Sequence, residues 1–307
     1  MLVMNNKILT IGIPTYNRAE YLDRCLNEVL SQAEGYSELI EIQVSDNASI
    51  DNTEAVIDKY ISLGYKIDYV KHKESVGMDG NFFSLYQRCF TKYMWMLSDD
   101  DFLLPNSLHK IMNLLKKEDL GILYLSNAWF NKESDILESF VDSEASYTKY
   151  NDPLAFVDRV NYWFTFISGN IINKDIVKNS INPVEFNGTF LLLIDWIIPA
   201  VFKGLPSYVI ENTILACKAG NTGGYKLFKV FGENFSFILN KMIERKDIPV
   251  AAKHIINRKL ITNFFPHFLS LDRTAFKNEA AFIALLKVFW NYKVFWTKLA
   301  PTFLKTK

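Results

Sequence analysis

Predicted strands and helices alternate through the first part of the chain, and this alternation restricts the possible folds more than any other feature. Four short segments rich in β-branched and aromatic residues are separated by amphipathic stretches of helical period. The predicted strands are residues 8–13, 39–44, 66–70 and 93–97. Helices of about 12 residues between strands are typical of parallel βαβ units. The sequence therefore predicts an α/β fold that is Rossmann-like, with a mostly parallel sheet flanked by helices.

The rhythm changes in the C-terminal part of the chain. A predicted strand over residues 206–217 is followed by a glycine-containing loop, and the chain then has a helical pattern almost to its end. We therefore expect an α/β domain over residues 1–225 and a C-terminal α-helical appendage over residues 226–307.

Polar residues fall directly after the predicted strands. Residues 15–18 follow the first strand, Asp46 follows the second, and residues 99–101 follow the fourth. Each has a simple explanation when taken alone, as a turn cap or a surface ion pair. Ligands of open α/β sheets, however, bind outside the carboxyl ends of the strands, so the fold would gather these residues along one edge. Together they predict a binding site.

Asp99, Asp100 and Asp101 are the most distinctive of these polar residues. Neighbouring carboxylates repel one another unless a cation or solvent compensates their charge. Carboxylate oxygens suit Mg²⁺ or Mn²⁺, and such an ion can hold a diphosphate. The alternative is a helix cap, because a helical pattern follows and acidic residues are favoured where a helix begins. One Asp is enough for a cap.

Composition excludes several classes of protein. Of the 307 residues, 49% are apolar and 22% are charged, which excludes a disordered chain. The 34 basic and 34 acidic residues balance, so we expect no nucleic-acid partner. Three widely spaced cysteines indicate a reducing compartment. The N-terminus lacks a secretory pattern and no apolar run reaches the roughly 18 residues of a membrane span, so we expect a cytoplasmic protein.

Two further segments contain candidate site residues. A predicted strand over residues 164–172 is interrupted at Gly169 and Asn170, where glycine indicates close backbone approach. A very apolar predicted helix over residues 189–202 contains one carboxylate, Asp195. If Asp195 faces the cleft, partial desolvation raises its pKa and suits it to accept a proton near neutrality. The alternative is an ordinary solvated position on the helix.

The segment 282–304 combines aromatic and aliphatic side chains with lysines, and no acidic residue follows Glu279. This composition is typical of an interfacial helix that lies on a membrane surface and is attracted to anionic lipid. The alternative is a helix that packs on the α/β domain or on a second subunit of a homo-oligomer.

Four motifs, in their order and spacing, resemble those of the family 2 glycosyltransferases, which have the GT-A fold. The resemblance covers residues 7–225. The motifs are Ile13-Pro14-Thr15-Tyr16-Asn17-Arg18, Val44-Ser45-Asp46-Asn47-Ala48-Ser49-Ile50-Asp51, the loop from Val76-Gly77 to Asn81, and Ser98-Asp99-Asp100-Asp101. With a later Asn-Thr-Gly-Gly segment, they look nearest to bacterial O-antigen enzymes of the abequosyltransferase-like group.

The resemblance implies that the first two motifs bind a nucleotide sugar. Pro14, Thr15, Tyr16 and Arg18 would line the nucleotide pocket, and Asp46 would accept a hydrogen bond from a pyrimidine base.

The resemblance assigns the later motifs to the reacting groups of the donor. Asn81 would hold the nucleotide side of the donor, Asp99 and Asp100 would face ribose and sugar, and Asp101 would ligate the metal through the diphosphate. Asp195 matches the position of the family's general base, although Ile194 stands where the family usually has Glu. Gly169 and Asn170 match its acceptor-side strand and loop.

These roles imply a metal-dependent, inverting glycosyltransferase that uses Mn²⁺ or Mg²⁺. Its partners would be a nucleotide-sugar donor and a saccharide acceptor, the latter lipid-linked and at the inner face of a bacterial inner membrane. One alternative is a nucleotidyltransferase acting on a sugar phosphate, which normally has a glycine-rich loop with Arg and Lys after the first strand. The other is a GT-A module that serves as a non-catalytic scaffold.

Overall fold

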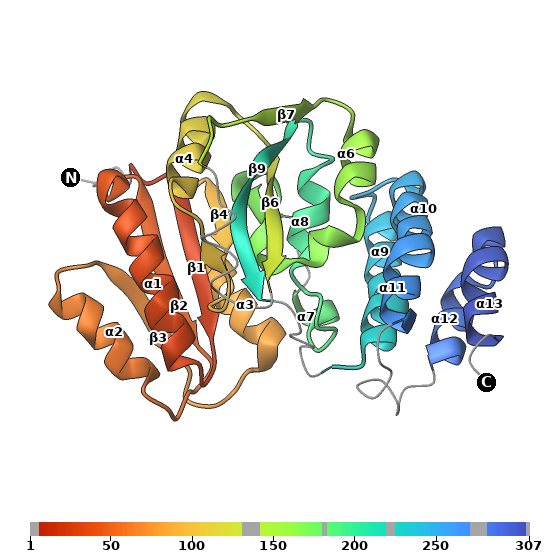
Figure 1. The fold of residues 1–307 in the computed structure, drawn as a ribbon, viewed down its shortest axis with the longest axis horizontal. Helices are drawn as coiled ribbons and strands as arrows, with labels where there is room; N and C mark the ends of the chain where they lie inside the picture. Colours follow the sequence, from red (N-terminus) through yellow and green to blue (C-terminus); the bar gives the residue numbers. More distant parts are fainter. Residues whose placement is uncertain (1–5, 131–141, 180–182, 219–224, 271–280, 305–307) are drawn as a thin grey trace.

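The computed structural model describes residues 6–130, 142–179, 183–218, 225–270 and 281–304. These residues form a mixed sheet with helices on both faces (Figure 1). The strands are β1 (Leu9–Thr15), β2 (Ile40–Asp46), β3 (Ile67–Lys71), β4 (Tyr93–Met96), β5 (Phe102–Leu103), β6 (Ile122–Phe130), β7 (Tyr147–Tyr150), β8 (Asn170–Asn173) and β9 (Ser207–Lys218). The helices of the first two thirds of the chain are α1 (Ala19–Ala33), α2 (Thr53–Ser62), α3 (Gly77–Arg88), α4 (Ser107–Lys117), α6 (Pro153–Val160), α7 (Pro183–Phe186) and α8 (Ile194–Ala200).

The strand order is β3-β2-β1-β4-β8-β6-β9-β5, with β7 paired to β9. β1 lies parallel to both β2 and β4, and β2 lies parallel to β3. β8 then runs antiparallel to β4 and β6, whereas β6 and β9 are parallel. The predicted α/β fold is therefore confirmed, and the carboxyl ends of β1, β2 and β4 meet at one edge of the sheet.

Alternation along each strand divides the core into two layers. In β4 and the residue after it, Tyr93, Trp95 and Leu97 belong to one apolar cluster, whereas Met94 and Met96 belong to the other. Successive side chains of a strand point to opposite faces, so a run that is apolar throughout requires helices on both sides. The first layer contains α1, α2 and α4, and the second contains α3, α6 and α8.

The C-terminal helices extend the second layer. They are α9 (Phe235–Glu244), α10 (Val250–Lys259), α11 (Phe265–Ser270), α12 (Ala281–Phe289) and α13 (Ala300–Leu304). Figure 1 shows them at the end of the molecule opposite α2. Their buried side chains belong to one continuous cluster that runs from Phe82 in α3 to Ala300 in α13. Among the described helices, none has the length and apolar character needed to cross a bilayer.

Two predicted elements differ from those observed. The predicted strand over residues 164–172 is mostly 3₁₀ turns, and only β8 at its end pairs with the sheet. The predicted helix over residues 189–202 is shorter and begins at Ile194. A regular helix cannot include Phe190, because its φ is 63°.

Candidate active site

A cavity of about 580 Å³ opens at the carboxyl ends of the parallel strands. One end is lined by residues after β1 and β2 and by the first turn of α3, and the acidic stretch after β4 lies between this end and an apolar wall from later segments. The lining residues are Pro14, Thr15, Tyr16, Arg18, Asn47, Ser75, Gly77, Met78, Asn81, Phe82, Ser98, Asp99, Asp100, Asp101, Trp129, Thr165, Phe166, Ile167, Phe190, Leu191, Leu193, Tyr225 and Phe231. Most of the predicted nucleotide-binding residues are therefore brought together.

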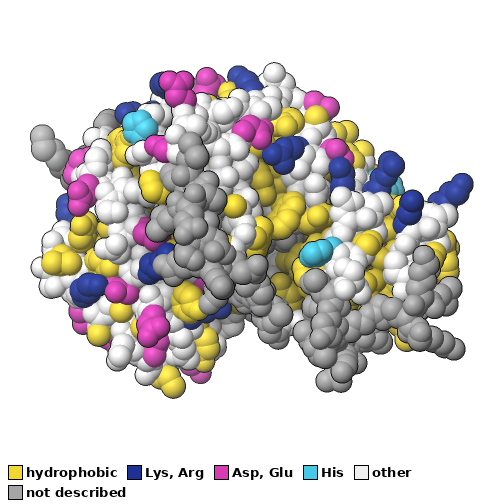
Figure 2. Space-filling model, viewed as in Figure 1, with side chains coloured by type: hydrophobic (Ala, Val, Ile, Leu, Met, Phe, Trp, Pro, Cys, Tyr) yellow, Lys and Arg dark blue, Asp and Glu magenta, His cyan; other side chains and the backbone are white. Residues whose placement is uncertain are grey.

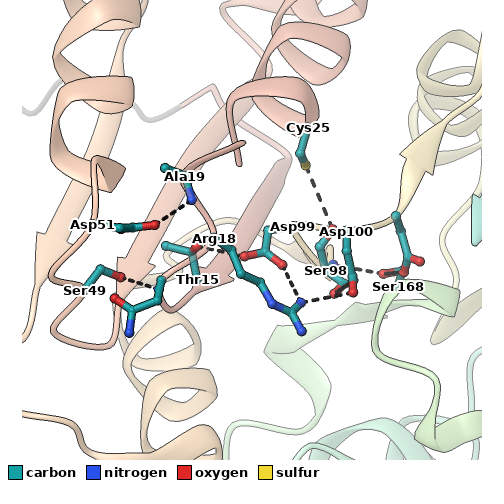
Figure 3. A network of polar contacts seen from close by, with 12 residues as sticks. Thr15, Arg18, Ala19, Cys25, Ser49, Asp51, Ser98, Asp99, Asp100 and Ser168 are labelled. Atoms are coloured by element: carbon teal, nitrogen blue, oxygen red, sulfur yellow. Dashed lines mark hydrogen bonds and ion pairs between the residues drawn. The ribbon is translucent and has the colours of Figure 1, made fainter. Parts of the chain in front are cut away.

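Two loops are fastened to each other at the nucleotide end. Asn17 has a φ of 51°, and its backbone N–H donates to Ser49 Oγ at 2.8 Å. Its side-chain oxygen accepts from the Ile50 N–H at 2.8 Å. Asp51 then accepts from the Ala19 N–H at 3.0 Å and caps α1 (Figure 3). This cross-bracing fixes the loop that presents Thr15, Tyr16 and Arg18 to the cavity.

Arg18 reaches across the cavity to the acidic stretch (Figure 3). Its Nη1 donates to Asp99 Oδ1 and to Asp100 Oδ2, both at 3.0 Å. Thr15 Oγ1 donates to Asp99 Oδ2 at 2.8 Å. Burial raises the pKa of Asp99 to about 6, although Arg18 and Thr15 oppose the shift. The carboxylates of Asp99 and Asp100 thus share the guanidinium of Arg18 as their positively charged partner.

Asp101 has a different environment. It is 6% exposed, and its Oδ2 accepts from Ser168 Oγ at 2.5 Å. Among the described residues, no basic side chain pairs with it. Burial raises the pKa of Asp101 to about 7, and the charges of Asp100 and Asp99 add to this shift. A cation beside this carboxylate would stabilise its ionised form, because an opposite charge counteracts the effect of burial.

This donor set fits a divalent cation. The described residues contain no group of three or more His, Cys, Asp or Glu side chains able to hold a metal by themselves. Asp101 nevertheless offers a cavity-facing carboxylate without a basic partner among those residues, and Asp99 and Asp100 add negative charge beside it. Hard oxygen ligands of this kind suit Mn²⁺ or Mg²⁺, whose remaining positions are commonly filled by water and substrate phosphates.

Asp46, the residue predicted to bind the base, does not line the cavity in this structure. Asp46 is fully buried and is not among the cavity-lining residues, because its carboxylate accepts from the Ser49 N–H at 2.7 Å and from Tyr69 OH at 2.8 Å. The next residue, Asn47, lines the cavity instead. Asp46 therefore holds the turn that presents Asn47, and its contact with a base stays a prediction.

Asn81 lies on the first turns of α3 and lines the cavity as predicted. Its Nδ2 donates to the Ser45 carbonyl at 3.0 Å. Its Oδ1 is buried and has no hydrogen-bond partner among the described residues. An unsatisfied buried amide oxygen is available to a ligand donor.

Gly169 and Asn170 lie behind the cavity wall. A Cβ on Gly169 would come within 2.7 Å of the Phe166 ring, and Asn170 Nδ2 donates to the Phe166 carbonyl at 2.9 Å. Neither residue lines the cavity, whereas Thr165, Phe166 and Ile167 do. The close approach predicted at Gly169 is present, because the Phe166 ring packs against it. Gly169 therefore supports the cavity wall and is not itself a lining residue.

Asp195 neither lines the cavity nor lies at a solvated position in this structure. It is fully buried, and its carboxylate pairs with Arg245, which follows α9. Leu193, two residues earlier, is a cavity-lining residue. Leu193 directly precedes α8 and lines the cavity, whereas Asp195 lies in the first turn of α8 and pairs with the residue that follows α9.

The apolar wall of the cavity was not predicted. It includes Phe190, Leu191, Tyr225 and Phe231, which come from two segments without a motif. A turn of positive φ at Gly188 and Phe190 presents the first two. In the sequence, Gly188 close before Phe190 was the available signal. A glycine in such a position also occurs in ordinary turns, so it does not identify a cavity-lining segment.

The fold and the cavity define a class of protein. A sheet of this kind, with a cavity at the strand ends and a run of aspartates after the fourth strand, is typical of a GT-A enzyme acting on a nucleotide sugar. The family model described as "Glycosyl transferase family 2" matches residues 10–178. The chain belongs to glycosyl transferase family 2, and it is a glycosyltransferase that uses a nucleotide-sugar donor.

Curated relatives support the assignment. The chain is 36% identical over 289 residues to abequosyltransferase RfbV of Salmonella typhimurium, covering 88% of this chain and 79% of that protein. It is 24% identical over 134 residues to chondroitin synthase of Escherichia coli, covering 43% of this chain and 19% of the synthase.

Solved structures agree on the fold. S. aureus TarS 1–349 in complex with UDP superimposes with a TM-score of 0.64 at 15% identity, covering 87% of this chain and 76% of that one. The mannosyltransferase PcManGT from Pyrobaculum calidifontis, in complex with GDP-Man and Mn²⁺, has a TM-score of 0.56 at 13% identity, covering 96% and 83%.

Proposed function

We propose that the protein transfers a sugar from a nucleotide-diphosphate sugar to a saccharide acceptor, with inversion and with a divalent cation at Asp101. The observation that carries this proposal is the convergence of Thr15, Arg18 and the three aspartates on one cavity. Thr15 and Arg18 keep Asp99 and Asp100 in place, and Asp101 remains for the cation.

The nucleotide end of the cavity can orient the donor. Tyr16 is 50% exposed and offers a ring face to a base, while Asn47 lines the same end. The first turn of α3, with Gly77 and Met78, lies beside them. Helix N-termini favour negative charge, so this end suits a nucleotide.

Asp101 would hold a divalent cation together with the diphosphate. When bound, such an ion stabilises the negative charge that develops on the departing diphosphate. Arg18 orients Asp99 and Asp100 toward the ribose and sugar. The apolar wall limits water near the anomeric carbon, which favours transfer over hydrolysis.

Asp195 remains the proposed base. Its support is its place in the chain, two residues after the cavity-lining Leu193. Deprotonating an acceptor hydroxyl would require its carboxylate to leave Arg245 and turn toward the cavity. An acceptor hydroxyl activated in this way attacks the anomeric carbon in line and inverts it.

The acceptor proposed here is a saccharide of a bacterial surface polysaccharide, carried on lipid. The similarity to an abequosyltransferase along most of the chain supports this acceptor class. A hexose or deoxyhexose would be the transferred sugar.

The first experiment is a thermal-shift comparison of UDP, CDP, dTDP and GDP, each with and without Mn²⁺. At about a hundredfold excess over Kd, a bound nucleotide adds about 2.7 kcal/mol to the free energy of unfolding. We expect one nucleotide to raise Tm by several degrees only when Mn²⁺ is present. The sugar derivatives of that nucleotide are then screened for transfer and hydrolysis. If no nucleotide stabilises the protein, the scaffold alternative is favoured.

We propose further that the C-terminal helices contact an anionic membrane surface. Ile283 and Lys287 lie four residues apart on α12 and share a face, and Trp290 directly follows the last residue of this helix. Trp296 Nε1 donates to the backbone carbonyl of Trp290 at 2.7 Å, which joins the segment that contains Trp296 to the end of α12. Trp290 is 62% and Trp296 is 50% exposed. Figure 2 shows Lys and Arg side chains on the end of the molecule formed by the C-terminal helices.

Vesicle sedimentation tests the membrane contact. Phosphatidylglycerol-containing vesicles should bind the protein, added salt should release it, and pure phosphatidylcholine should bind it weakly. Changing both Trp290 and Trp296 to Ser should weaken binding about tenfold or more, because exposed indoles anchor interfacial helices. Phe90→Ser is the control, since Phe90 is 81% exposed and lies outside the C-terminal helices. Equal loss in both variants would contradict the assignment.

A further inference from the structure

We infer that Phe190 is a sugar-binding platform, presented to the cavity by a strained turn that Asp79 holds in place. The inference rests on the proposed function and adds to it the chemistry by which a sugar ring is recognised. The ligand is the apolar face of a pyranose, whose C–H groups pack on an aromatic ring.

The backbone at Phe190 is in an uncommon conformation. Its φ is 63°, and Gly188, two residues earlier, has a φ of 83°. Glycine adopts such angles readily, whereas a bulky residue there is an outlier that the surrounding structure must maintain. Strain of this kind concentrates at binding and catalytic sites. A large aromatic residue therefore occupies a backbone conformation that favours glycine.

Asp79 maintains the turn from one side. It is 3% exposed, and its Oδ2 accepts from the Phe190 N–H at 2.9 Å while its Oδ1 accepts from the Leu192 N–H at 3.2 Å. Asp79 belongs to the first turn of α3, directly after Met78 of the nucleotide end. One buried carboxylate thus ties the apolar wall to the helix beside the nucleotide.

Asn234 maintains the turn from the other side. Its Nδ2 donates to the Thr189 carbonyl at 3.0 Å. Asn234 ends the π-helical segment Lys229–Asn234, which precedes α9 and also contains the cavity-lining Phe231. The turn is therefore held between the α/β layers and the C-terminal helices, which fixes the ring direction.

The ring of Phe190 remains accessible. Phe190 is 40% exposed although it lines the cavity, and its ring centroid lies 5.7 Å from that of Tyr225. The neighbouring wall residues Leu191 and Leu193 are apolar and offer no side-chain hydrogen bond. A wall of this composition favours a ligand with an exposed C–H surface, such as the face of a sugar ring. The nearby aspartates would accept hydrogen bonds from the hydroxyl groups of that sugar.

The two sugars of the reaction present the same chemistry. The transferred sugar and the acceptor sugar both place a pyranose near Asp99–Asp101, which lines the same cavity as Phe190. The KM values for the donor and for the acceptor show whether Phe190 contacts the transferred sugar or the acceptor sugar.

The experiment compares Phe190→Gly and Phe190→Tyr with wild type, and Phe90→Ala is the matched control because Phe90 is exposed and outside the cavity. The probes are UDP-, CDP-, dTDP- and GDP-hexoses and deoxyhexoses as donors, and octyl glycosides as acceptors. Phe190→Gly should raise KM for one sugar substrate about tenfold, a loss typical of one well-packed aromatic contact. Phe190→Tyr should keep wild-type constants. The affinity for the free nucleoside diphosphate should not change.

Stability separates a binding role from a structural one. The Tm of Phe190→Gly should lie within about 3 °C of the wild-type Tm, because relief of the positive φ offsets the lost ring contacts. Asp79→Asn keeps one acceptor oxygen and turns an NH2 group toward the other of the two backbone N–H groups, so it should raise the same KM while Phe190 is still present. A rise in acceptor KM alone assigns the acceptor ring, and a rise in donor KM with slower donor hydrolysis assigns the transferred sugar.

Two results would overturn the inference. In the first, wild type is active and Phe190→Gly has unchanged KM for both substrates, which leaves the proposed function intact. In the second, wild type neither binds a nucleotide nor turns over any donor, in which case the proposed function fails and the platform fails with it.

Discussion

Asp101→Asn should lower kcat/KM for sugar transfer by about 10²- to 10³-fold, the effect of removing one preorganised electrostatic group from a transition state. The amide keeps the shape of Asp101 and can still accept from Ser168, but it brings no charge to a cation. Mn²⁺-dependent stabilisation by the nucleoside diphosphate should disappear as well. Steady-state kinetics and thermal shift measure the two effects.

The same substitution should leave the ligand-free fold intact. Because burial raises the pKa of Asp101 to about 7, the carboxyl contributes to folding most at low pH, and this contribution is lost as pH rises through about 7. At pH 8 without metal, Asp101→Asn should therefore unfold at no lower temperature than wild type. Asp175→Asn is the control, since this carboxylate is 64% exposed. Undiminished transfer by Asp101→Asn would reject the metal assignment.

Asp195→Ala should lower the free energy of unfolding by about 3 kcal/mol, because Arg245 would lose a fully buried partner. Arg245→Met should cause a loss of similar size, since it leaves the Asp195 carboxylate buried without that cation. The double variant should lose less than the sum of the two. Urea unfolding gives all three values.

Activity then decides between the two roles of Asp195. A general base is worth about 10²- to 10⁴-fold, so Asp195→Asn should lower kcat at least a hundredfold while nucleotide binding survives. Arg245→Met keeps the carboxylate and should retain much more activity than Asp195→Asn. If both variants lose transfer equally and in proportion to stability, Asp195 is a structural partner and not the base.

The sequence predicted the parts of this molecule that depend on local pattern. The β-branched strands and the helices between them identify the first four parallel strands, and the two-sided burial of β4 follows from its continuous apolar run. Topology then places Thr15, Arg18 and the aspartates at one edge, as expected for residues after parallel strands.

Side-chain direction could not be predicted in the same way. Asp46 and Asn47 are neighbours in a turn, and the hydrogen bond from Tyr69, on a different strand, determines which of them reaches the cavity. The direction of Asp195 depends on Arg245, which lies 50 residues away. The apolar wall combines segments that have no shared periodicity, so only tertiary packing reveals it.

The continuous core beneath α3, α8 and the C-terminal helices has a consequence for the design of chimeric proteins. Phe231 and Asn234 follow the end of the α/β layers, yet one lines the cavity and the other fastens its wall. A chimera that exchanges the last eighty or so residues with those of a relative would therefore alter the cavity wall as well as the C-terminal helices.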